Sequence, residues 1–285
     1  MGLTVAGVTL SLSACATFKH IQPYPSAPGP ITVSVGSAPL SKMNELPLGA
    51  FYDEPHRIVV SGHQKGVGVG MMFGLVGVLV ADSANKSAAE NRFGGDVTRM
   101  ATDLTEITRG ELAREQAERK MADTLLPGAG GQLVVTPFAV FTVNKAGNAR
   151  LYAMLKAELK GTADSEPRWS VRYFARAAGE HPIAGSDSWS VTGRYAAGIK
   201  TALQRAVSAL FDEMQGRYTT ERKTLAKGRF AYFADDVELR VIVVHDERDF
   251  VIGRLAVGDV MVMSGTQVMD RADFTFKDAD FSTPK

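Results

Sequence analysis

Two groups of side chains in this sequence have residue types that could do chemistry. One is the cluster His245, Asp246, Glu247 and Asp249, whose nitrogen and oxygen donors suit divalent metals. It falls where a hairpin turn is expected, and charged residues are common there. The other is Cys15, the single cysteine, which cannot form an internal disulfide or a cysteine-based zinc site. Without an HExxH or GxSxG pattern, we predict no metal, no cofactor and no enzymatic activity.

Composition limits the class of protein further. The chain has 285 residues, of which 45% are hydrophobic and 22% charged, so it contains enough apolar residues to bury a core. Its 32 basic and 31 acidic residues leave a net charge of +1. We therefore expect no nucleic-acid partner driven by bulk charge.

The residues around Cys15 predict where the protein resides. Residues 3–12 form an uncharged apolar run, too short for a membrane-spanning helix, which needs about 20 residues. It is followed by Leu12-Ser13-Ala14-Cys15, which resembles the lipobox of bacterial lipoproteins. The resemblance implies a signal peptide over 1–14, an acylated (palmitate-bearing) Cys15 and, because Ala16 rather than Asp follows, an outer-membrane anchor facing the periplasm. The alternative is a buried N-terminal strand in which Cys15 is a small hydrophobe.

The remainder divides into a tether and two folded parts. Residues 15–30 hold the lipidated cysteine and a proline-rich stretch, which predicts an extended tether. We expect an α+β domain over 31–227 and a small β module over 228–285, unless that module continues the same sheet.

Hydrophobic periodicity predicts the elements of these parts. An antiparallel meander with helices packed against it is the expected fold class, followed by a small antiparallel β module. Its outline is similar to lipoproteins of the curli-secretion type. Gly110 should interrupt the first helix, whose Glu115 and Arg119 are expected on a solvated face. The expected strands are 31–35, 57–61, 133–143, 150–159, 168–176, 230–233, 237–244, 250–255, 260–263 and 274–276, and the expected helices are 96–126 and 195–214.

An uncharged glycine-rich segment, residues 66–81, lies between Lys65 and Asp82. Gly66, Gly70 and Gly74 recur every four residues, which on a helix allows another helix to approach closely, and the spacing resembles a glycine zipper. Because glycine costs about 1 kcal/mol per position inside a helix, a packing partner is needed. That partner could be the rest of the domain, a second copy or the membrane. A dinucleotide site is set aside, since no GxGxxG fits.

Basic residues on two neighbouring strands could share one face of a sheet. The alternation places them opposite the apolar residues, with Tyr152 and Phe174 among them, and predicts either a solvated face or a surface for lipid phosphates, lipopolysaccharide or an acidic protein. The C-terminal region is acidic, which suggests docking between modules or copies. The candidate residues are Arg150, Lys156, Lys160, Arg168, Arg172 and Arg176.

These observations favour a non-enzymatic scaffold or interaction protein anchored by lipid, with a protein partner or self-association. A pore-type secretion subunit using residues 66–81 is the alternative, and an envelope hydrolase is third.

Overall fold

A computed structural model describes residues 22–25, 31–41, 45–47, 49–62, 74–100, 102–121, 131–161, 167–255 and 264–278. Three long antiparallel strands form the centre of its sheet: β4 (Gly131–Val143), β5 (Asn148–Gly161) and β6 (Trp169–Arg176). Leu133, Leu159 and Trp169 lie side by side across them. Side chains alternate between faces of a strand, so the predicted apolar positions gather on one face, as expected.

Shorter strands extend this centre along β4. Both β1 (Ile31–Val35) and β3 (Ile58–Ser61) run parallel to β4, one after the other, and β2 (Phe51–Asp53) pairs with β3. The two-residue β7 (His181–Pro182) pairs with the start of β5. The turn over residues 145–147 joins β4 to β5, where the sequence predicts a hairpin.

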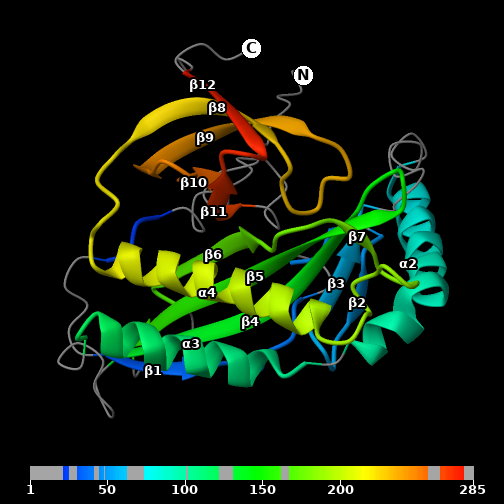
Figure 1. Ribbon diagram of the computed structural model, residues 1–285, viewed down its shortest axis with the longest axis horizontal. Helices are drawn as coiled ribbons and strands as arrows, with labels where there is room; N and C mark the ends of the chain where they lie inside the picture. Colours follow the sequence, from blue (N-terminus) through cyan, green and yellow to red (C-terminus); the bar gives the residue numbers. More distant parts are fainter. Residues whose placement is uncertain are drawn as a thin grey trace, which may run out of the picture.

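Three helices lie in the described residues: α2 (Gly74–Arg99), α3 (Leu104–Glu118) and α4 (Arg194–Met214). Figure 1 shows α3 and α4 side by side along one face of the sheet, with α2 beside β2 and β3. The break that the sequence predicts at Gly110 is wrong. Met100, Thr102 and Asp103 are not helical, and the Asp103 carboxylate accepts hydrogen bonds from two amides at the start of α3.

The C-terminal strands continue the central sheet, one of the two arrangements that the sequence allows. They are β8 (Arg222–Gly228), β9 (Val237–Asp246), β10 (Phe250–Leu255), β11 (Gly265–Asp270) and β12 (Phe274–Asp278). Thr266, Gln267 and Val268 of β11 pair in parallel with β6, which joins all twelve described strands into one mixed sheet. The sequence missed β8 and β11. The strand that the sequence predicts at 230–233 is wrong, because these residues form a turn region. The strand predicted at 260–263 lies outside the described residues.

The predicted fold class, an α+β meander packed with helices, is therefore wrong. Strands make up 41% of the structure, against three described helices, and the sheet is mixed and largely continuous. The cause is the β6–β11 pairing, which joins residues about 90 positions apart in the sequence and leaves no local pattern.

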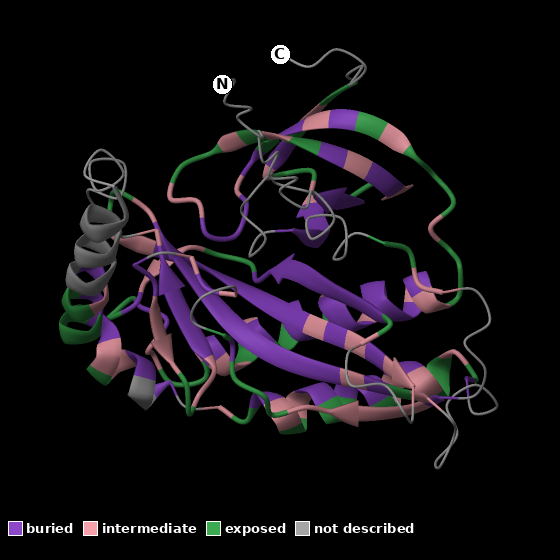
Figure 2. Ribbon diagram, turned by 180° about the vertical axis from the view of Figure 1, so that it is seen from behind, coloured by how far each residue is buried: buried purple, intermediate pink, exposed green. Residues whose placement is uncertain are grey.

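The described residues form three apolar clusters, and Figure 2 shows how much of the central strands is buried. The largest cluster lies between the central strands and the helices. The second lies on the opposite face and includes Leu40, Leu46, Ala231 and Tyr232, and the third lies among β8–β12. Both faces of β5 and β6 are consequently buried.

Candidate interaction site

The N-terminal segment Gln22–Pro25 is held against the fold. The Trp169 indole Nε1 donates to the Gln22 carbonyl oxygen at 2.9 Å, and the Tyr24 ring meets the Trp169 ring edge-on with centroids 5.0 Å apart. Burial raises the pKa of the Tyr24 hydroxyl to about 12. Folded contacts therefore begin upstream of Ile31, where the sequence predicts only a tether.

Glu213 of α4 joins this segment to β6 and β10. Its Oε1 accepts from the Tyr24 amide at 3.2 Å and from the Arg254 guanidinium at 3.0 Å, while Oε2 accepts from the Tyr173 hydroxyl at 2.8 Å. Glu213 is 4% exposed and Arg254 7%. Burial raises the pKa of Glu213, and the Arg254 charge offsets that rise only in part. We call Gln22–Pro25 together with Trp169, Tyr173, Glu213 and Arg254 the N-terminal clamp.

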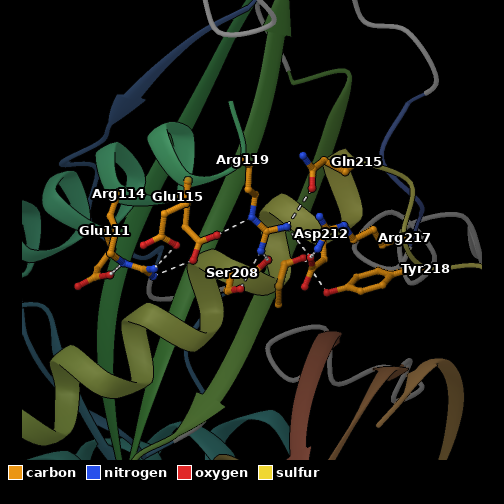
Figure 3. Close-up of polar contacts among 11 residues, drawn as sticks. Glu111, Arg114, Glu115, Arg119, Ser208, Asp212, Gln215, Arg217 and Tyr218 are labelled. Carbon is orange, nitrogen blue, oxygen red and sulfur yellow. Dashed lines mark hydrogen bonds and ion pairs between the residues drawn. The ribbon is translucent and has the colours of Figure 1, made fainter. Parts of the chain in front are cut away.

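A charged groove of about 470 Å³ lies between α3 and α4. Figure 3 shows the polar side chains that meet there. Arg119 bridges the helices, with hydrogen bonds to Glu115 and to Asp212, Gln215 and Ser208. Burial lowers the pKa of Arg119, but the bonds to Asp212 and Glu115 more than reverse this. The expected solvated face for Glu115 and Arg119 is wrong, since Glu115 is 3% exposed and holds Arg119, which bridges the two helices.

Arg114 extends the same network along α3. Its guanidinium bonds Glu111 at 2.8 Å, Glu115 at 2.7 Å and Glu118 at 2.7 Å, and the Glu111 bond is the main reason that its pKa is raised. Charges of both signs are matched here at short range. The groove therefore holds two helices in register rather than presenting uncompensated charge to an anion.

The basic face predicted on β5 and β6 exists but is not exposed. Arg150, Arg172 and Arg176 point away from the helices as expected, yet they are only 2%, 1% and 8% exposed. Described residues of the segments 40–41, 45–47, 49–52 and 229–236 cover that face. The predicted free surface for an anionic partner is thus wrong for these three residues. Arg168, at the strand's end, is exposed.

Internal partners neutralise the buried cations. Glu45 accepts from Lys156 at 2.8 Å and from Arg172 at 3.2 Å, and burial raises the pKa of Glu45 while the Lys156 hydrogen bond reverses this to a net lowering. Arg150 donates to the carbonyl oxygens of Phe233 and Ala234 at 2.6 and 2.9 Å.

The acid-rich C-terminal region supplies the remaining partners. Asp273 bonds Arg176, and Asp270 bonds Arg205 on α4 at 3.0 Å. The opposite charges noted in the sequence therefore meet within one chain, where they fasten the β11–β12 turn to β6 and α4.

The other candidate residues are only partly placed. Cys15, Gly66 and Gly70 lie outside the described residues, and Gly74 is the first residue of α2. Among the described helices, none combines the length and apolar character that crossing a membrane requires.

The acidic cluster near β9 is divided among ion pairs. His245 contacts Glu247 at 2.9 Å, and Asp246 binds Arg222 at 2.8 Å and also Arg271. Within the described part of the chain, no three histidine, cysteine or acidic side chains converge as metal ligands would.

Comparison with known proteins gives a likeness to solved structures alone. No family model and no curated protein matches the sequence. Among solved structures, the chain is similar to a putative lipoprotein from Caulobacter crescentus CB15, at 13% identity and a TM-score of 0.27, covering 39% of this chain and 81% of that one. A likeness this slight carries no argument about mechanism or role.

The sequence reasoning missed the N-terminal clamp. The available signal was Tyr24, a large aromatic residue between two prolines in a stretch otherwise suited to solvent. Its partners Trp169, Glu213 and Arg254 come from three distant elements, so no spacing rule could have assembled them.

Proposed function

We propose that the protein is a lipid-anchored, non-enzymatic scaffold of the bacterial cell envelope, held in the outer membrane through Cys15 and facing the periplasm. The proposal rests on the short stretch of sequence between Cys15 and Gln22, the first residue that is held against the fold. Leu12-Ser13-Ala14-Cys15 ends only seven residues before Gln22, whose carbonyl oxygen is bound by Trp169. A lipid on Cys15 would thus be joined to the folded part by a short linker.

The internal pairing of charges also favours a scaffold over an enzyme. Catalytic groups usually have pKa values that burial or neighbouring charges shift from the ordinary range. Arg114 and Arg119 in the α3–α4 groove, and Arg150, Arg172 and Arg176 on the β5–β6 face, have acidic or carbonyl partners that hold them in place. These networks stiffen the fold, which suits a protein whose task is to hold a partner.

Labelling with a palmitate analogue, followed by membrane fractionation, tests the anchor. Wild type should be labelled and sediment with membranes, whereas Cys15→Ser should be unlabelled and remain in the precursor form. Ser13→Ala is the matched control, because it keeps a small residue in the same motif and should be processed normally. Unlabelled wild type would refute the proposal.

Self-association through Gly66, Gly70 and Gly74 is the assembly that we propose for the scaffold. Leucine at Gly70 would block the close approach that a glycine surface allows, while alanine would mainly raise helix propensity. Gly70→Leu should reduce the assembly size measured by light scattering in detergent, and Gly70→Ala should not. Unchanged assembly in Gly70→Leu would assign the segment to internal packing.

A further inference from the structure

We infer that one end of the domain, where α3 and α4 finish and β6 begins, rests on the lipid surface, while the opposite end points away from it. This inference rests on the proposed lipid anchor at Cys15. It concerns a surface, and its occupant is the headgroup layer of the membrane that holds the anchor. We call this surface the clamp end.

The position of the clamp identifies the surface. Trp169 opens β6, and Glu213 lies one residue before the end of α4. Arg119, directly after α3, contacts Asp212 and Gln215, so the C-terminal ends of both helices meet there. Figure 1 shows these termini together at one end of the sheet, with the turn between β4 and β5 at the other.

Chain length then limits how far this end can lie from the membrane. Seven peptide units separate Cys15 from Gln22, and a fully extended chain covers at most about 3.6 Å per residue, or about 25 Å in all. Helix α4 alone, with 21 residues at 1.5 Å each, is about 31 Å long. The extended linker is thus shorter than α4, which leads to the far end of the domain. The clamp end therefore stays near the headgroups.

The contacts of the clamp are strong enough to keep Gln22–Pro25 docked, so the linker to Cys15 stays short. It combines an aromatic contact, an indole hydrogen bond and an amide bond to a buried carboxylate. A hydrogen bond to a charged group is stronger than one between neutral groups, and an edge-on aromatic pair adds to the apolar area that is buried. Undocking Gln22–Pro25 would therefore be a minor event at equilibrium.

Charge does not carry the inference. Lys120, Arg168 and Arg217 are exposed at the clamp end, and Glu118 is exposed beside them. Because the inference rests on chain length and on the position of the clamp, the contact should not depend on anionic lipid.

Single-cysteine labelling measures the orientation. Lipidation alkylates the sulfur of Cys15, so an introduced thiol is the reactive one. Gln215→Cys and Lys120→Cys report on the clamp end, and Ala146→Cys and Ser186→Cys on the far end, all at exposed positions. Each variant carries a fluorophore and is bound to phosphatidylethanolamine–phosphatidylglycerol vesicles that contain a headgroup-linked quencher.

We expect loss of emission from labels at 215 and 120, and little loss at 146 and 186, with the same pattern in phosphatidylcholine vesicles. In Tyr24→Ala the clamp is released and the contrast should shrink. Tyr24→Phe keeps the ring and should preserve the contrast. Equal quenching at both ends, or an undiminished contrast in folded Tyr24→Ala, would overturn the inference. Failure of the wild-type protein to float with vesicles would instead overturn the anchor itself.

Discussion

Replacement of Arg254 by methionine probes the centre of the clamp. Methionine keeps most of the buried volume but removes the positive charge that faces Glu213 at 3.0 Å. The Glu213 carboxylate, 4% exposed, would then retain only the Tyr173 hydroxyl and the Tyr24 amide as hydrogen-bond donors. The variant therefore measures how much free energy of unfolding is lost when a buried carboxylate has no positive charge beside it.

The expected loss follows from burial. Removing one partner of a buried ion pair typically lowers the free energy of unfolding by about 3–5 kcal/mol. Because two neutral donors remain on Glu213, we expect a loss of about 3 kcal/mol near pH 8. At about 2–4 °C per kcal/mol for domains approaching this size, the melting temperature should fall by about 6–12 °C.

The loss should shrink in acid. The folded-state pKa of Glu213 is raised above its ordinary value of 4.5, so its contribution to stability is full below that value and is lost as pH rises through the folded pKa. Without Arg254 the folded pKa rises further. In acid both proteins carry a neutral Glu213, so the difference between them should be smallest near pH 4.5 and largest at pH 8.

Urea unfolding followed by tryptophan fluorescence at the two pH values gives the measurement. Arg248→Met, at an exposed position in the turn between β9 and β10, is the matched control and should change stability by less than about 0.5 kcal/mol. A deficit for Arg254→Met below about 1 kcal/mol, or one equally large at both pH values, would show that the pair is not the electrostatic centre described here.

Two glycines of opposite environment provide further checks by thermal melting. Gly95 lies in α2 with open space where a Cβ would sit, so Gly95→Ala should stabilise by about 0.5–1 kcal/mol through helix propensity; a destabilisation would contradict its exposed helical setting. Gly253 sits at the irregularity between β9 and β10, where a Cβ would collide with Val241 Cγ1, so Gly253→Ala should cost about 1–3 kcal/mol. A neutral effect there would mean that the curl of β8–β12 adjusts freely.

Local patterns were enough for the elements that carry one clear period. The alternation along β4, β5 and β6 and the 3.6-residue period of α4 predict those elements closely, and the turn near Gly147 has the residues a hairpin needs. The sequence also separates Arg150, Arg172 and Arg176 from the apolar face. Each of these properties depends on neighbours within a few positions.

Only the tertiary structure decided what covers each face. The sequence predicts a solvated surface for the three arginines, because a strand pattern shows which face of the sheet a residue lies on. It does not show what packs against that face. Their partners, among them Glu45, Phe233 and Asp273, lie far away in the sequence. The joining of β11 to β6 and the clamping of Tyr24 are equally non-local. Such contacts form between segments that share no spacing, so they are determined by chain closure and burial rather than by a readable motif.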